Sequence, residues 1–357
     1  MSLTRDLALG TLGLSALAWW PHVPQDVVQH LAWQLGASLT VASWLWWGRG
    51  SPPGNPWPAA MVAVAVCNLL SHEMRADGVV MTNLVLACGW LRAFAASVPS
   101  TLAIRSLLVV CAVQFAAVCS QSLGFDPWFG HLPWDLRVTP NGLAPTPPLA
   151  AAWMALGLAL CWPRHRGLAA PFLLGLWLTR SWASWVAVLV GFAWYYRHVR
   201  FSIKASVAAS LTVFTALSWQ VWWPKLAFRL DWWLPAFKAW TERWVDGIGI
   251  GQFLGLANRL APKYTVNGLP GWETLHHEPL QWLLEAGILG AVALVGWGAW
   301  SLRRWVPSRE TAALCGLIVL LVFSGFHSVF HAAGLACAAL CLVAITDSTT
   351  EVGDAEG

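Results

Sequence analysis

Charged residues are scarce in this sequence. Aspartate, glutamate, lysine and arginine make up 11% of the 357 residues, whereas hydrophobic types make up 57%. A soluble globular domain has about a quarter of its residues charged. Because so few charges cannot cover a surface that faces water, the composition argues against a soluble domain and favours lipid as the main solvent.

Three other features that the sequence lacks exclude particular classes of protein. None of the eight cysteines forms a Cys-x-x-Cys spacing, so we expect neither a disulfide framework nor a thiolate zinc site. The first apolar segment, 7–20, lacks a basic leader and a small-residue cleavage site, so we interpret it as a retained span. No internal repeat of the transporter type is visible. The net charge of +4 is spread over loops, so we expect no nucleic-acid partner.

Tryptophan, by contrast, is abundant. Many of its 28 copies stand at the ends of apolar segments, as at 46–47 and 222–223. Membrane–water interfaces collect tryptophan because the ring is apolar and its N–H needs a partner. We therefore interpret most of these residues as interfacial, while a minority could stack on a bound ligand.

The apolar segments predict an all-α, polytopic membrane protein with about 11–12 transmembrane helices. We place the spans near 5–20, 27–47, 58–71, 78–97, 104–123, 148–162, 167–179, 182–196, 202–222, 280–302, 310–326 and 328–345. The two spans around Arg180 are short, so they are either half-spans or a tightly packed hairpin.

Basic residues of the short loops all fall on one side of these spans. They are Arg5, Arg49, Arg105, Arg164, Arg166, Arg197, Arg200, Lys204, Arg303, Arg304 and Arg309. Lysine and arginine of short loops concentrate on the cytoplasmic side of membrane proteins. This side, with both termini, is therefore predicted to be cytoplasmic.

The chain divides into four parts under this topology. We expect an N-terminal bundle of helices over 1–222, a large loop over 223–279, C-terminal helices over 280–346, and a disordered acidic tail over 347–357. The large loop carries most of the charge of the non-cytoplasmic face. Within it, Leu226–Trp240 mixes tryptophan, phenylalanine and leucine with arginine and lysine, which predicts a helix lying in the membrane interface.

Two histidines stand where the large loop ends. His276 and His277 are followed by Glu278 at the start of an apolar segment that also contains Glu285. A neutral histidine can accept the proton of an attacking hydroxyl group. Glu285 needs a partner or a water-filled cavity in such a segment. We expect it to be a structural hydrogen-bond partner.

Arginines on the same face could bind an anion. Arg180 stands at the turn between two apolar helices, and Arg229 stands near the start of the large loop. Guanidinium groups bind phosphate oxygens bidentately, so two converging arginines suit a diphosphate. Arg75 is an accessory candidate, although we favour a pairing with Asp77 within its own loop.

A metal site is conceivable but incomplete. His327 and His331 are four residues apart and could join His276 around a metal ion. No carboxylate or thiolate obviously completes this set, so we expect packing or hydrogen-bonding roles and no metal.

Four features of the sequence are similar to one known superfamily. They are the run 276–281 followed by 284–290, the glycine turn 247–253, the triplet 179–181, and Arg229 followed by Trp232 and Trp233. Over about 168–300 they resemble the O-antigen ligase and O-antigen polymerase superfamily. Its members transfer glycans linked to undecaprenyl diphosphate at the periplasmic face of the bacterial inner membrane.

The resemblance implies a GT-C-like membrane fold and an inverting, metal-independent glycosyltransferase without a cofactor. The donor would be an undecaprenyl-diphosphate glycan, and the acceptor a sugar hydroxyl of a glycan or of a lipid A core. By position, His276 would be the base, and Arg180 and Arg229 would hold the diphosphate. His277, Glu278 and Arg75 would be accessory, and His277 stays open as an alternative base.

Other functions stay open at this point. A ligase, a polymerase and a ligase that glycosylates proteins would share this site and differ in acceptor. A transporter or flippase for a lipid-linked sugar would carry charges at mid-span, whereas here they gather on one face. A non-catalytic protein of cell-envelope assembly is the third class.

Overall fold

The computed structural model describes residues 2–17, 25–47, 78–126, 130–131, 140–144, 146–163, 165–196, 219–253, 256, 265–266, 269–270, 275–305, 311–328 and 332–354. This part of the chain is mostly helical, as the sequence predicts. The loops contain two antiparallel pairs of strands, and each strand is two residues long. Strand β1 (Phe125–Asp126) pairs with β2 (Gly130–His131), and β3 (Thr265–Val266) pairs with β4 (Leu269–Pro270).

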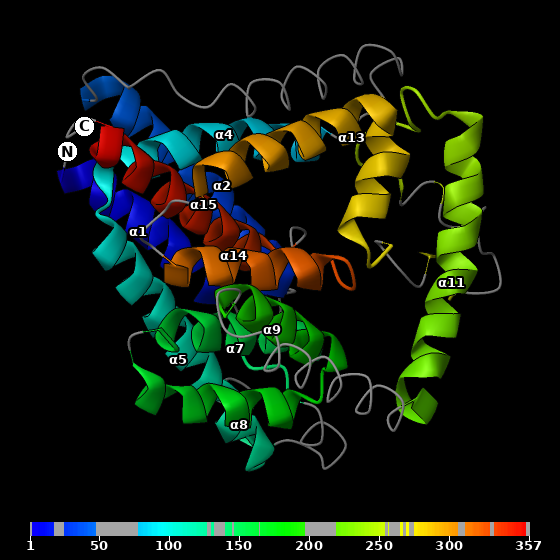
Figure 1. Ribbon diagram of the computed structural model, residues 1–357, viewed down its shortest axis with the longest axis horizontal. Coiled ribbons are helices and arrows are strands. Elements are labelled where there is room, and N and C mark those ends of the chain that lie inside the picture. The colour runs from blue at the N-terminus through cyan, green and yellow to red at the C-terminus, as the bar shows by residue number, and fades with distance from the viewer. Residues whose placement is uncertain are drawn as a thin grey trace.

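Most of the helices form one bundle, from which α11 stands apart (Figure 1). The helices are α1 (Ser2–Leu17), α2 (Gln25–Trp47), α4 (Gly78–Ser97), α5 (Ser100–Ser122), α7 (Pro147–Cys161), η1 (Arg166–Leu168), α8 (Ala169–Thr179), α9 (Trp182–Tyr195), α11 (Trp219–Glu242), α13 (Glu278–Trp305), α14 (Thr311–Ser324) and α15 (Ala333–Asp354).

Helix α7 is the centre of the bundle. Its residues from Ala150 to Cys161 are all buried, and α5, α8, α9 and α14 pack around it. Small side chains let these neighbours approach closely. Gly157, for example, lies under the ring of Phe172, so a Cβ atom there would meet the ring at 2.5 Å. Close packing over small residues is typical of helices that associate within a membrane.

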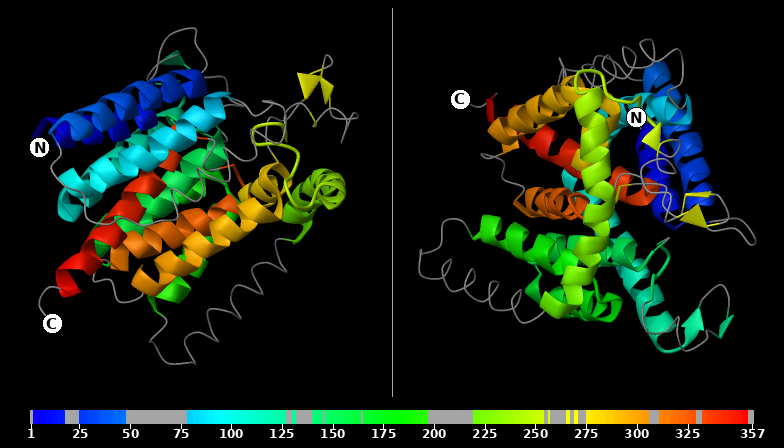
Figure 2. Two further views of the ribbon diagram at one scale, coloured as in Figure 1. Left: turned by 90° about the horizontal axis from the view of Figure 1, so that it is seen from above. Right: turned by 90° about the vertical axis from the view of Figure 1, so that its right-hand side faces the viewer.

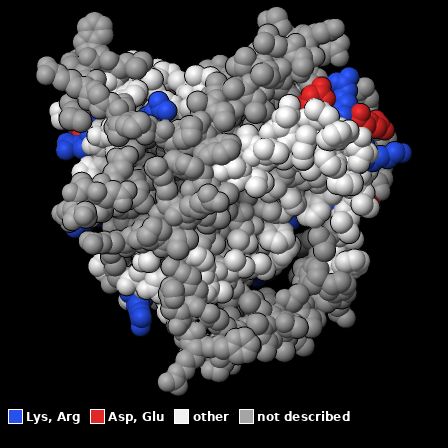
Figure 3. Space-filling view, turned by 45° about the horizontal axis from the view of Figure 1, so that its top comes forward, with Lys and Arg blue, Asp and Glu red and all other residues white. Residues whose placement is uncertain are grey.

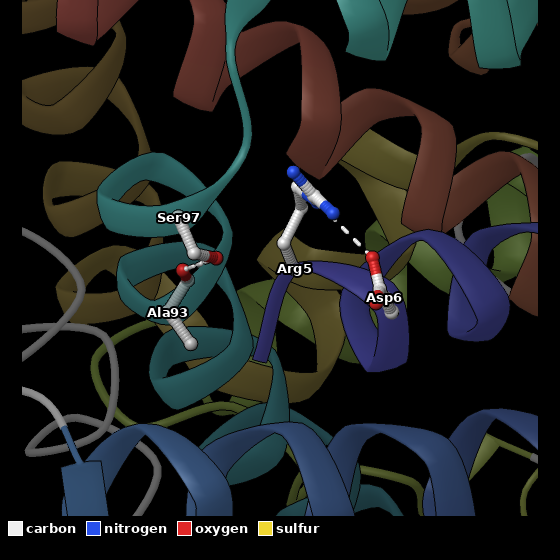
Figure 4. A network of polar contacts seen from close by, with 4 residues as sticks. All are labelled: Arg5, Asp6, Ala93 and Ser97. Carbon is white, nitrogen blue, oxygen red and sulfur yellow. Dashed lines mark hydrogen bonds and ion pairs between the residues drawn. The ribbon is translucent and has the colours of Figure 1, made fainter. Parts of the chain in front are cut away.

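A second group of helices, α1, α2, α4 and α15, packs beside this centre. Hydroxyl groups pair inside it, since Thr4 bonds Ser43 at 2.8 Å and Thr11 bonds Thr40 at 3.3 Å. Figure 4 shows the exposed ion pair of Arg5 with Asp6 in α1, and Ser97 Oγ donating to the Ala93 carbonyl in α4. Polar side chains of α1 and α2 thus point inward as well as outward.

Apolar side chains are exposed on the outside of the bundle. Leu31, Leu35 and Leu39 recur every fourth residue of α2 and are all exposed. In Figure 3 the described charged side chains are few, and most of them lie near the margin of the face in view. Among the described helices, α5 alone is long and apolar enough to cross a membrane by itself, and six apolar helical stretches of 10–17 residues accompany it.

Helix α11 contacts mainly the N-terminal part of α13 (Figure 1 and the right view of Figure 2). The predicted interfacial helix Leu226–Trp240 lies within it. Both ends of the chain lie at the end of the long axis away from α11 (Figure 1), where Figure 2 shows them apart from each other. Helices α1 and α15 contact each other, with Gly334 close to Ala16.

Most described helix ends lie within a few residues of the predicted spans, but three helices differ from the prediction. Helix α11 begins at Trp219, inside the predicted span 202–222, and runs on to Glu242, where a span end at 222 and a separate interfacial helix were predicted. Helix α13 is broken at Gly287, where one straight span was predicted. Helix α15 continues to Asp354, into the acidic segment that was predicted to be disordered. Once a helix is nucleated, each added residue gains a backbone bond, which favours such extension. The predicted span 58–71 and most of 202–222 lie outside the described residues.

Candidate functional site

A small apolar core brings the two ends of the large loop together. Trp232 and Ala236 of α11 pack with Phe253 from the glycine turn, Leu275, and Leu284 of α13, and all five are buried. Trp233 Nε1 also donates a hydrogen bond of 3.0 Å to the Leu275 carbonyl. Because this core is separate from that of the bundle, it fixes α11, the turn and α13 as one unit.

The break in α13 lies inside this unit. Gly287 has φ 65° and ψ −164°, a conformation that only glycine adopts readily. In an uninterrupted helix, the N–H groups of Ile288 and Leu289 would donate to the carbonyls of Leu284 and Glu285. The break removes both bonds, and buried backbone groups need replacements.

The backbone of 244–249 supplies them. The four replacement bonds run from Ile248 N to Leu284 O (2.9 Å), Gly249 N to Glu285 O (3.0 Å), Ile288 N to Trp244 O (2.8 Å) and Leu289 N to Val245 O (3.4 Å). A Cβ atom on Gly247 or Gly287 would strike the facing backbone. The predicted glycine turn is therefore a segment that inserts its backbone into the gap in α13.

Glu285 anchors the same turn through its side chain. Its buried carboxylate accepts from Gly251 N (2.9 Å), Phe253 N (3.3 Å) and Gln281 Nε2 (3.2 Å). Gln281 Oε1 in turn accepts from Leu275 N at 3.1 Å. The prediction that Glu285 is a structural hydrogen-bond partner is confirmed.

The two histidines have different surroundings. His277 is the N-cap of α13, because its Nδ1 accepts from Leu280 N at 3.1 Å. Burial and the charge of Arg229 lower the pKa of His277, which keeps the ring neutral at pH 7. The edge of the ring contacts Trp233, with centroids 4.8 Å apart. The lone pair of His277 Nδ1 is thus already used as the cap of α13, at the point where the large loop ends.

His276 is held in a left-handed backbone conformation, with φ 52°. This conformation costs a residue other than glycine about 1–2 kcal/mol. The imidazole of His276 faces that of His327, with ring centroids 6.1 Å apart. The tight turn therefore directs His276 toward the bundle while His277 caps α13.

Arg229 links α11 to the bundle. Its Nη2 lies 3.2 Å from His327 Nε2, just beyond the end of α14. Its Nη1 is buried and has no hydrogen-bond partner among the described residues. Burial lowers the pKa of Arg229 to about 10, so the group remains a cation at neutral pH. An unpaired buried donor on a cation is costly, and an anionic ligand would relieve that cost.

His327 is the common neighbour of these groups. Its ring stacks on Phe323 at a centroid distance of 4.9 Å and also faces His276 and contacts Arg229. The adjacent Phe326 meets the edge of Trp182 at 4.9 Å. The turn after α14 therefore joins the loop unit to the start of α9.

Arg180 lies at the turn before α9, two residues from Trp182. It is the C-cap of α8 and has φ 51° and ψ 29°. Among residues other than glycine in the described part of the chain, only Arg180 and His276 have positive φ. The side chain of Arg180 is exposed. Helices α8 and α9 each pack on α7 and hardly contact each other, so they do not form the tightly packed hairpin that the sequence allowed. The turn between them leads into Trp182, which meets Phe326 beside His327.

The remaining predicted residues are less central. Glu278 begins α13, where the helix dipole stabilises a carboxylate. Arg75 and His331 lie outside the described residues. Within the described part of the chain, no three histidine, cysteine, aspartate or glutamate side chains are grouped as they would be around a metal ion.

His327 is the site residue whose partner the sequence did not reveal. The spacing of His327 and His331 suggested packing, hydrogen bonding or a metal, and nothing in it pointed to Arg229. A polar residue close to the end of an apolar helix was the only available sign. No protein-family model and no curated protein matches the chain.

Proposed function

We propose that the protein is a multi-pass inner-membrane glycosyltransferase that moves a glycan from undecaprenyl diphosphate to an acceptor hydroxyl at the periplasmic face. It would be inverting and metal-independent, as in the superfamily that the sequence resembles. One observation carries the proposal. Arg229 is a half-buried cation whose buried Nη1 has no partner among the described residues, and His327 lies next to both Arg229 and the imidazole of His276.

The outside of the bundle supports a membrane location. A helix that faces water exposes a polar stripe, whereas α2 exposes Leu31, Leu35 and Leu39. Val292 and Val295 are exposed in the same way on α13. Both chain ends lie away from α11, which agrees with cytoplasmic termini and a periplasmic site (Figure 1). The short helices would cross the membrane only as members of the bundle, not as independent spans.

The arginines fit a diphosphate leaving group. Arg229 offers Nη1 toward an anion, and its guanidinium keeps its charge at neutral pH. The turn of Arg180 adjoins the aromatic contact between Trp182 and Phe326. Negative charge grows on the diphosphate oxygens as the glycosidic bond breaks, and fixed cations stabilise that charge most in a site with little water.

His276 fits the role of base. In the proposed step, the acceptor oxygen attacks the anomeric carbon from the face opposite the diphosphate and forms the new C–O bond. The old C–O bond breaks, and its electron pair leaves with undecaprenyl diphosphate. The hydroxyl proton passes to His276. His277 is less suited to this role, because its Nδ1 caps α13.

The direct test is transfer by the purified full-length protein in lipid nanodiscs. It would be given an undecaprenyl-diphosphate oligosaccharide, with core lipid, glycan and peptide acceptors offered separately. We expect product with one acceptor class, which would separate ligase, polymerase and protein ligase. His276→Ala should lower the rate about 100-fold or more, as for other general bases. His165→Ala is the matched control, because His165 is exposed beside η1.

Two results would contradict the proposal. One is no product from folded protein with any of the acceptors. The other is an unchanged rate in His276→Ala, which would remove the base from the mechanism. Movement of the intact donor across the bilayer without transfer would instead support a flippase.

A further inference from the structure

Arg229 has an unusual partner. A guanidinium can only donate hydrogen bonds, so His327 Nε2, at 3.2 Å from Nη2, must accept in this contact. A histidine nitrogen accepts only when it carries no proton. His327 is therefore a neutral imidazole whose ring proton is on Nδ1. No acidic side chain takes this place in the described ion pairs.

The ring of His327 is itself held in place. It stacks on Phe323 with an angle of 21° between the ring planes. The backbone N–H groups of Phe326 and His327 both donate to the Phe323 carbonyl, at 2.9 and 3.0 Å, which closes the turn after α14. The side chain of Arg229, by contrast, extends from α11, which lies outside the bundle. The fixed ring can thus orient the longer, more mobile side chain.

We infer that His327 is a positioning residue of the proposed transfer, which orients Arg229 toward the donor diphosphate only while its imidazole is neutral. The inference rests on the proposed function. Protonation of His327 would remove the lone pair on Nε2 and place a second cation next to the guanidinium. The added positive charge would attract the diphosphate, but Arg229 would no longer be oriented toward it. We therefore expect donor binding to weaken at acidic pH when His327 is protonated.

Among the described residues, several ionisable groups lie near His327 or near its neighbours. Arg229 faces it from α11, and His276 faces it from the segment before α13. Arg180 lies at the turn next to its neighbour Phe326. His327 is the sole ionisable side chain of 311–328 apart from the buried Cys315. Because His276 is a second imidazole next to His327, a test must separate the two histidines.

The test compares His327→Gln with His327→Leu. Glutamine carries Oε1 as many bonds from Cα as histidine carries Nε2, so it can accept from Arg229 but cannot become a cation. Undecaprenyl diphosphate would be titrated into protein in nanodiscs at pH 7.5 and pH 5.5, with tryptophan fluorescence as the readout. We expect His327→Leu to weaken binding about tenfold at pH 7.5, as for loss of a hydrogen bond to a charged group.

His327→Gln should restore the affinity to within about threefold, and its affinity should change less between the two pH values than that of the wild type. His165→Leu is the control that should bind as the wild type does. If Arg229→Met weakens binding but His327→Leu matches the wild type at both pH values, the positioning role is wrong and the proposed function stands. If the wild type binds no undecaprenyl diphosphate, the proposed function and the positioning role both fail.

Discussion

At the scale of single residues, Arg180 and His276 share a backbone conformation that glycine would adopt more easily. Their φ angles are 51° and 52°. Helices commonly end on a glycine in this conformation, as α8 ends on Arg180. A side chain kept there at a cost of about 1–2 kcal/mol points to a role of the side chain rather than of the turn.

Arg180→Gly should therefore separate stability from function. We expect it to raise the free energy of unfolding by about 1 kcal/mol, because the strain disappears. The same change should weaken binding of undecaprenyl diphosphate, because one cation is lost. Denaturation and titration of the purified variant measure the two effects.

Arg166→Gly is the control for this experiment. Arg166 lies in η1 with an exposed side chain, so glycine there should lower stability slightly and leave binding unchanged. A fall in the stability of Arg180→Gly would show that the arginine supports the turn.

A second prediction concerns Arg229, whose replacement should affect stability and donor binding in opposite directions. Burial lowers the pKa of Arg229 to about 10, so the charged form is less favourable in the folded state than in the unfolded chain. Below pH 10 the charge therefore opposes folding. Arg229→Met should keep or raise the stability of the donor-free protein, by up to about 2 kcal/mol, and should abolish donor binding.

The pH dependence of Arg229 follows from the same pKa. Donor affinity of the wild type should fall as the pH rises through about 10, where the guanidinium loses its proton. Over the same pH range the buried charge, which destabilises the folded state, disappears. The free energy of unfolding should therefore increase as the pH rises. Arg229→Met should show neither change, as tested by titration and denaturation at pH 8 and above.

At the scale of elements, the hydrophobic pattern was enough to locate the helices. Helix α4 has the bounds that the sequence predicts, and α8 and α9 end within two residues of theirs. Apolar runs there are limited by local features such as Arg180, which interrupts two uniformly apolar segments. Local sequence determines such boundaries because each helix bonds its own backbone.

The break in α13 could not be predicted in the same way. It depends on the backbone of 244–249, which is distant in sequence and replaces the missing helical bonds. A Glu-x-Gly sequence in an apolar helix does not indicate which distant segment will supply the replacement hydrogen bonds. The contact of Arg229 with His327 is equally non-local, with 98 residues between them. The sequence thus suggested the site residues but not the residue that joins them.

Gly287→Ala tests the break directly. Its φ and ψ are close to those reserved for glycine, and a Cβ atom would strike the Val245 carbonyl. We expect a loss of about 2–4 kcal/mol in unfolding free energy. Hydrogen exchange should then increase at the amides of 248–253.

Gly10→Ala provides the comparison. Gly10 is a helical residue of α1, and a Cβ atom there would meet nothing within 4 Å. Alanine should therefore stabilise α1 by up to about 1 kcal/mol. Equal effects of the two substitutions would contradict the role given to the break.

At the scale of the whole molecule, the exposed leucine and valine stripes lead to a prediction of topology, as does the placement of both chain ends at the end of the long axis away from α11. Alkaline phosphatase is active only when exported, so a fusion after Asp246 should be active and a fusion after Trp305 should be inactive. Fusions of a green fluorescent protein at the same points should give the reverse pattern. Phosphatase activity at both positions would contradict the predicted orientation.

Helix α11 packs on α13 rather than on the bundle, and this has a consequence for evolution. The residues that would hold the donor pyrophosphate are divided between a bundle, which has to fit a constant lipid carrier, and an outlying arm. Substitutions on the outer face of the arm, such as at Leu234 or Phe237, disturb little of the bundle core. If the protein is the transferase proposed above, such an arm would be free to change with the acceptor, and proteins built in this way could diverge in what they modify while keeping one way of releasing the carrier.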